Sequence, residues 1–221
     1  MSELLHRVLG EIRSLQARTT ALEERLRTVY DRCEQAAATI PDCVALGEYG
    51  GCVITPWHAL GAWHHQHQVG ATIRYRWGER RVARLQKAGD NTVDIAIYTF
   101  DQAVPDSVEP ARYLPWDWAR HLPTDARGER LRRPLRALGT KAGGSLHESA
   151  VYQLGADYAA EARYVVGGDS GQPVWLPLPQ PVLIGCWLFA GTGPSVAHHQ
   201  EDIRRCTVLD EHPAAMLEAE W

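Results

Sequence analysis

The sequence predicts a mainly β protein in which two antiparallel barrels follow a long N-terminal helix. The first forty residues are rich in Leu, Arg, Glu and Ala and contain no proline before Pro41, which is typical of one continuous helix. After Pro41 the pattern changes to short β-like runs separated by Gly, Pro and Asn, which is typical of strands and turns. We therefore divide the chain into a helix at 1–40, a first barrel at 41–110, a connector at 111–130 and a second barrel at 131–221.

The helical segment carries an apolar repeat with alternating three- and four-residue steps. Its apolar positions are Leu5, Val8, Ile12, Leu15, Leu22, Leu26 and Val29, with Thr19 in the remaining slot. This spacing covers about four heptads and predicts a coiled coil. In that register Arg18 and Glu23 flank the seam as an oppositely charged pair between parallel helices. We expect a homo-oligomer or a docked partner. The alternative is a helix that folds back on the barrels, which would show the same stripe.

Two sets of β-like runs follow the helix. The first set covers residues 44–46, 51–55, 71–77, 80–86 and 94–100, and the second covers 133–138, 150–154, 158–164, 173–176, 182–189 and 204–209. The segment at 110–128 indicates a connector with turns. Closing each set into a barrel removes exposed strand edges. A short helix is expected at 210–220, with Asp210 as its cap and Pro213 in its first turn.

The run VGGDSGQP at residues 166–173 is typical of the way a proteolytic serine is presented for attack. A hydroxyl is a poor nucleophile at neutral pH, so Ser170 needs a neighbouring base and donors for the oxygen that becomes negative. Gly168 lets the backbone pass close to a substrate carbonyl, so its N–H and that of Ser170 would form an oxyanion hole. A lipase-type Gly-x-Ser-x-Gly elbow is the nearest alternative, but Gln172 stands where its last glycine belongs.

Two motifs upstream supply an imidazole and a carboxylate. His58 follows the apolar run 52–55 in the stretch VITPWHAL, which predicts a strand running into a short helical turn. Asp94 opens another buried run after the turn at 89–91. The order His, Asp, Ser over three separate motifs resembles the chymotrypsin-like (trypsin-like) serine peptidases. The resemblance covers the chain from about residue 43 to the C-terminus.

The resemblance implies two six-stranded barrels with the site in the cleft between them. It makes His58 the general base and later the acid, Asp94 the carboxylate that orients it, and Ser170 the nucleophile. Gly168 and Ser170 would donate the oxyanion-hole hydrogen bonds. Taken singly, each residue has a plainer interpretation: His58 is a core imidazole, Asp94 caps a turn and Ser170 is a loop serine. Together they predict acyl transfer.

The same resemblance indicates the substrate-binding residues. Tyr164, six residues before the serine, would line the primary specificity pocket, and because it is not a carboxylate it does not predict a preference for Lys or Arg. Leu188 and Phe189 lie in the run 184–191, which resembles the edge against which the substrate backbone pairs. We expect an apolar or small residue before the scissile bond.

Two departures from the family pattern bear on the site. In secreted members a newly cut N-terminus pairs with the aspartate beside the serine, but this chain offers no Ile-Val-Gly-Gly start, so we expect Asp169 to bind another donor. Secreted members also join a cysteine to one just after the catalytic histidine. Here Cys52 is present but Ala59 follows His58, so that disulfide is not expected.

Composition and charge argue against several classes of function. The net charge of −4 disfavours a nucleic-acid partner, and no window is apolar and long enough for a membrane span. The first residues lack a signal-peptide pattern, so a cytoplasmic location is expected. The five cysteines are odd in number and do not have the spacing of metal ligands, so reduced thiols are expected. The histidine groups at 64–67 and 198–199 are interpreted as surface loops, so no metal and no cofactor is predicted.

Two functions remain from the sequence. The first is an intracellular serine endopeptidase that cleaves a protein or peptide through an acyl-enzyme, in a limited and regulated way, with its N-terminal helix for oligomerisation or partner docking. The alternative is a catalytically idle scaffold or binding protein of the same fold, in which the helix is the working part.

Overall fold

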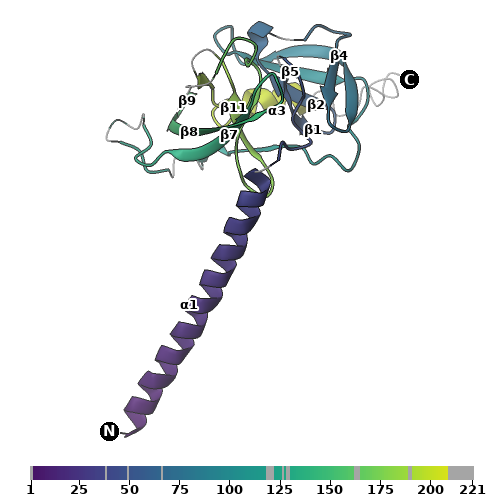
Figure 1. Ribbon diagram of the computed structural model, residues 1–221. Helices are drawn as coiled ribbons and strands as arrows, with labels where there is room; N and C mark the ends of the chain where they lie inside the picture. The colour runs from purple at the N-terminus through teal and green to yellow at the C-terminus, as the bar shows by residue number, and fades with distance from the viewer. Residues whose placement is uncertain are drawn as a thin grey trace, which may run out of the picture.

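The computed structural model describes residues 2–37, 39–48, 50–65, 67–117, 122–125, 127, 130–161, 165–188 and 191–208. It consists of one long helix that projects from a body made of two β-sheets, as Figure 1 shows. The mainly β fold with a preceding N-terminal helix, expected from the sequence, is confirmed.

Helix α1 spans Ser2–Ala37, so its 36 residues extend over about 54 Å. It leaves the body as a rod and does not fold back on the sheets (Figure 1). The six apolar residues of its stripe whose side chains are described are 43% to 71% exposed: Val8, Ile12, Leu15, Leu22, Leu26 and Val29. The apolar stripe therefore has no cover within the described part of the chain.

The first sheet lies within residues 52–100 and is antiparallel throughout. Its strands are β1 (Cys52–Thr55), β2 (His58–Gly61), β3 (Thr72–Tyr75), β4 (Gly78–Ala88) and β5 (Ile95–Phe100), in the order β1-β2-β5-β4-β3. All six residues of β5 are buried. Apart from Ala96 they are all β-branched or aromatic, which suits a central strand covered on both faces.

The second sheet has seven strands. They are β6 (Arg112–Tyr113), β7 (Leu135–Thr140), β8 (Leu146–Leu154), β9 (Asp157–Ala160), β10 (Pro173–Leu176), β11 (Val182–Cys186) and β12 (Thr192–Pro194), in the order β12-β9-β8-β7-β10-β11-β6. The pairs are antiparallel except β11 with β6, which is parallel. The two sheets therefore have five and seven described strands, where the resemblance implied six in each barrel. Strand β6 comes from the segment expected to be a connector.

The hydrophobic core joins the two sheets. The core cluster of the first sheet also contains Leu138, Trp175 and Leu183 from the second sheet. A separate cluster beneath the second sheet contains Tyr158 and Trp187. Because side chains from both sheets share one core, the relative position of the two sheets is set by close packing.

Three sequence expectations differ from the structure. Residues 204–209 were expected as a strand, but helix α3 covers Gln200–Val208. Its Ile203 is fully buried and Cys206 packs on the same core, a three-residue spacing that suits a helix. The run 44–46 makes only two isolated bridges. Third, the sequence did not predict strands β2 and β12. The helix expected at 210–220 lies outside the described residues.

Among the described residues, no helix combines the length and the apolar content that a membrane span requires. The four cysteines that the structure describes outside α1 all carry free thiols: Cys43, Cys52, Cys186 and Cys206.

Candidate functional site

The first half of the candidate site forms where β2 and β5 lie side by side. The antiparallel register puts Gly61 of β2 opposite Ala96 of β5. The chain after Gly61 turns into a 3₁₀ helix at Trp63–His65, and Asp94 directly precedes β5. In an antiparallel pair the end of one strand lies next to the start of the other. The pairing therefore brings His64 to Asp94, although thirty residues separate them in sequence.

The Asp94 carboxylate binds His64 at two points. Asp94 Oδ1 accepts a hydrogen bond from the His64 backbone N–H at 2.9 Å, and Asp94 Oδ2 lies 2.5 Å from His64 Nδ1. The side chains are 26% exposed for Asp94 and 40% for His64. Two contacts from one carboxylate fix both the position of the residue and the rotation of its ring, so Nδ1 is held by the carboxylate and Nε2 is the nitrogen left for other chemistry.

The structure corrects the histidine that the sequence assigned to Asp94. His58 was expected in a helical turn, but Thr55 and His58 close a two-residue hairpin, and His58 is the first residue of β2. Its side chain is 2% exposed, and its Nδ1 lies 2.7 Å from Thr55 Oγ1. The short helical turn exists, but six residues later, at His64. The expectation that Asp94 orients His58 is therefore wrong.

The second half of the candidate site is the glycine-rich turn at residues 166–172, which we call the nucleophile loop. Gly168 and Gly171 have φ values of +96° and +84°, a backbone region that favours glycine. The turn is closed by hydrogen bonds from Asp169 N to Val166 O at 3.2 Å and from Gln172 N to Asp169 O at 3.0 Å. Ser170 is half-buried at its centre.

The Asp169 side chain holds the nucleophile loop from inside. It is 2% exposed, and its two oxygens accept hydrogen bonds from the backbone N–H of Ala142 at 3.0 Å and of Val166 at 2.9 Å. A buried carboxylate needs such donors because burial without them is costly. The structure thus identifies the donors that the sequence left open: they are backbone amides of the described chain.

Gln172 joins the nucleophile loop to the first half of the molecule. Its side chain is fully buried, its Nε2 donates to Gly47 O, and its Oε1 accepts from Thr140 Oγ1 at 2.9 Å. A methyl group at Gly50 would lie 2.6 Å from Gln172 Oε1, so any side chain there would displace the Gln172 amide. Gln172 and Gly47 are 125 residues apart, and in the sequence Gln172 stands out only as a departure from a lipase motif.

Both halves adjoin residues 186–188 at the end of β11. Trp187 O accepts a hydrogen bond from Gly171 N, and Trp187 N donates to Gln172 O, each at 2.8 Å. Burial raises the pKa of the Cys186 thiol, and the charge of Asp94 nearby adds to this. One short segment therefore contacts the nucleophile loop and lies close to Asp94.

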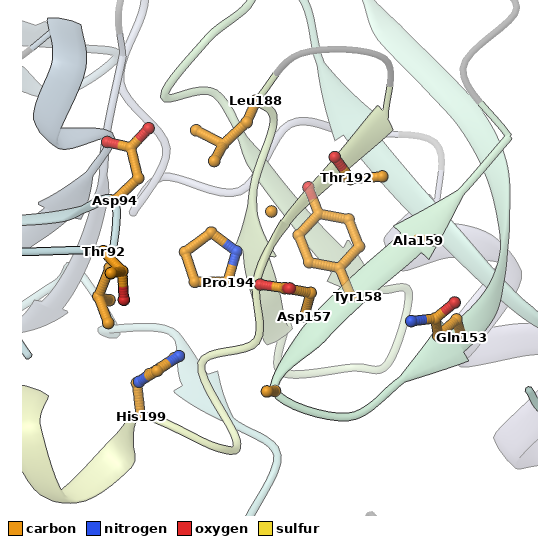
Figure 2. A pocket seen from close by; sticks show the side chains of 13 residues that line it. Thr92, Asp94, Gln153, Asp157, Tyr158, Ala159, Leu188, Thr192, Pro194 and His199 are labelled. Carbon is orange, nitrogen blue, oxygen red and sulfur yellow. The ribbon is translucent and has the colours of Figure 1, made fainter. Parts of the chain in front are cut away.

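Asp94 also borders a cavity of about 530 Å³. Figure 2 shows Asp94 and Leu188 at one end of it, Tyr158 and Asp157 at its centre and His199 near α3. Burial, with a smaller effect of the neighbouring His198, lowers the pKa of His199. Of the three residues expected to bind substrate, Leu188 lines this cavity, whereas Tyr164 and Phe189 lie outside the described residues.

Within the described part of the chain, no group of three His, Cys, Asp or Glu side chains could hold a metal ion. The histidine group at 64–67 instead serves other contacts, since His64 binds Asp94 and the ring of His67 packs edge-on against Tyr98 at 5.4 Å. One signal could have identified His64. Residues 52–61 are long enough to form two strands joined by a Pro-Trp turn. In that interpretation the helical turn comes after residue 61, at His64.

No protein-family model matches the chain, and no curated protein matches it in sequence. Among solved structures, a mutant of human heparin-binding protein (CAP37) is similar, with a TM-score of 0.54 and 15% sequence identity over 78% of this chain and 94% of that one. That protein is a chymotrypsin-like serine protease homologue without activity. At this identity the likeness shows the fold alone: the chain has a chymotrypsin-like fold with two curled half-barrel sheets, an N-terminal helix and a short helix near the C-terminus.

Proposed function

We propose that the chain is an intracellular serine endopeptidase in which Ser170 is the nucleophile, His64 the general base and Asp94 the carboxylate that orients it. The observation that carries the proposal is the two-point contact of Asp94 with His64, next to a segment that also binds the nucleophile loop. The free thiols of the four described cysteines outside α1 support a reducing compartment.

The geometry of His64 supports proton transfer in a defined direction. With Nδ1–H directed to Asp94, Nε2 accepts the Ser170 hydroxyl proton as the oxygen attacks the carbonyl carbon of the substrate. The N–H groups of Gly168 and Ser170 then bind the oxyanion. His64 returns the proton to the leaving amine, the C–N bond breaks, and water hydrolyses the acyl-enzyme with His64 again as base.

Substrate binding follows from the chain that borders the nucleophile loop. We propose that the acyl portion of the substrate runs along residues 184–191, with Leu188 near the scissile bond and with Tyr164 and Phe189 contributing to the pocket. An apolar or small residue before the scissile bond remains our prediction for this pocket.

Covalent labelling tests the proposal directly. A fluorophosphonate reacts only with a serine whose proton is removed by a neighbouring base, so the wild type should label, Ser170→Ala should not, and His64→Ala should label at least about a thousandfold more slowly. His58→Ala is the matched control and should label at nearly the wild-type rate. A wild type that never labels while folded would overturn the proposal.

A catalytically idle scaffold of the same fold is the second candidate. It is favoured by one observation, that one of the similar solved structures, the heparin-binding protein mutant, belongs to a homologue without activity. The two candidates differ in the labelling experiment, because an idle scaffold leaves the probe unreacted in every variant.

We also propose that α1 joins two copies of the chain in a parallel coiled coil. The two central heptads of the α1 stripe have Ile12 and Thr19 at one core position and Leu15 and Leu22 at the other, a pattern that favours two strands. The outer heptads have the reverse pattern, with Leu5 and Leu26 at the first position and Val8 and Val29 at the second, so the orientation of the pair is argued from charge. Parallel helices bring Arg18 opposite Glu23 of the partner copy. A fully overlapped antiparallel pair would instead bring Arg18 opposite Arg25 of that copy, a repulsive contact.

Sedimentation or light scattering tests this association. Wild type should be a dimer, and Leu22→Asp should be a monomer because a carboxylate in the seam is desolvated without a partner. Ala17→Asp is the matched control, since Ala17 lies on the outer face in the same register, and it should remain a dimer. A wild type that stays monomeric at high concentration would contradict the proposal.

A further inference from the structure

The carboxyl group of Glu48 lies against the nucleophile loop and has no part in the proposed mechanism. A Cβ atom at Gly168 would lie 3.9 Å from both Cγ and Cδ of Glu48, and 3.7 Å from Cβ of Ala142. Glu48 is exposed, and among the described residues it has no ion-pair partner. An unneutralised carboxylate therefore lies beside the residue whose N–H would bind the oxyanion.

The backbone that precedes Glu48 is held by two hydrogen bonds. The preceding residue, Gly47, accepts the hydrogen bond of the fully buried Gln172 side chain through its carbonyl oxygen. Leu46 N donates to Arg74 O at 2.7 Å, which attaches the same turn to β3. Glu48 is thus presented by a turn attached both to the first sheet and to the nucleophile loop, which limits the motion of its backbone.

Glu48 faces the part of the substrate that leaves. In the proposed function the acyl portion runs along residues 184–191, and this segment contacts the nucleophile loop at Gly171, after Ser170. Glu48 and Ala142 lie beside the loop at Gly168, before Ser170. Because the two neighbours adjoin the loop on either side of Ser170 in sequence, we infer that the chain that follows the scissile bond passes Glu48.

We propose that Glu48 selects substrates with an arginine or lysine just after the scissile bond; this inference rests on the proposed endopeptidase function. A guanidinium or ammonium group bound there would pair with the carboxylate. It would also cancel the repulsion between Glu48 and the oxyanion of the tetrahedral intermediate, which a neutral substrate residue leaves in place. The charge therefore acts on both binding and the chemical step.

The test uses two peptides that differ only in charge. A peptide library and mass spectrometry identify a cleaved bond, and that peptide is then synthesised with arginine or with citrulline, its neutral analogue of nearly the same shape, after the bond. In the wild type kcat/KM should be about tenfold higher for the arginine peptide. In Glu48→Gln the ratio should fall to about one, with the citrulline peptide cleaved as fast as before or faster, because the repulsion is removed.

The matched control is Glu109→Gln, which removes an exposed carboxylate from a loop beside Pro56 and Pro105 and should leave the ratio unchanged. High salt should reduce the wild-type ratio, since it screens an exposed ion pair. An enzyme that labels with fluorophosphonate but shows the same ratio in Glu48→Gln would overturn this inference alone. A chain that never labels would overturn the proposed function itself.

Discussion

The two halves of the candidate site are built by different kinds of interaction. His64 meets Asp94 because β2 and β5 pair in one register, so this half depends on contacts between strands that are distant in sequence. The nucleophile loop is closed by its own backbone hydrogen bonds and by the Asp169 side chain. A glycine-rich serine turn can thus be encoded in one short run, whereas the histidine proposed as its base is positioned by the alignment of two strands.

The largest expected effect separates His64 from His58. We predict that His64→Ala lowers kcat/KM by at least about 10⁴-fold, because the general base is lost. His58→Ala should leave kcat/KM of the folded enzyme within about tenfold and instead lower stability by about 2–4 kcal/mol, since it opens a cavity in a buried hairpin. Peptide hydrolysis and denaturant unfolding measure the two effects. The reverse pattern would show that strand pairing does not supply the base.

The next prediction concerns Gln172, the side chain that joins the two halves. Gln172→Ala removes the partners of Gly47 O and Thr140 Oγ1 and leaves space in the core, so stability should fall by about 2–4 kcal/mol. Gly50→Ala should also destabilise the fold, because the added methyl group overlaps the Gln172 amide.

The double variant tests the geometry of this contact. In Gly50→Ala combined with Gln172→Ala, the new methyl group enters the space that the amide vacated, so the two losses should be less than additive in denaturant unfolding. Additive losses would mean that the two positions do not share this contact.

These cases also explain how much of the molecule was predictable. The α1 helix and the glycine-rich turn around Ser170 were found because each is defined by a local pattern of residue types. His64 was missed because the residues after Thr55 were interpreted as a helical turn, whereas residues 56–57 are the turn of a hairpin, and this hairpin decides which histidine reaches Asp94. The contact of Gln172 with Gly47 joins residues 125 positions apart, and no local pattern encodes it.

A smaller effect is expected from Asp169. Asp169→Asn keeps the shape of the side chain, but one of its two acceptors becomes a donor that faces the N–H of Ala142 or Val166. We predict a stability loss of about 1–3 kcal/mol and slower fluorophosphonate labelling, measured on the same preparation. Asp90→Asn is the control: Asp90 also accepts a backbone N–H, from Thr92, but at the surface, and should change neither quantity measurably. Equal effects of the two variants would show that burial of Asp169 does not matter.

The smallest predicted effect is a pH dependence of stability that comes from two histidines outside both halves of the site. Burial lowers the pKa of His199 beside the cavity and that of His147 on β8 below the ordinary value of about 6.5. As pH falls below about 6.5 the unfolded chain binds these protons before the folded chain does, so stability is full above that pH and declines toward the folded-state pKa values. Between pH 7.5 and 5.5 the melting temperature should therefore fall less in His199→Gln and in His147→Gln than in wild type, as thermal unfolding at the two pH values measures. If the fall were the same in all three proteins, neither imidazole would be kept neutral by its burial.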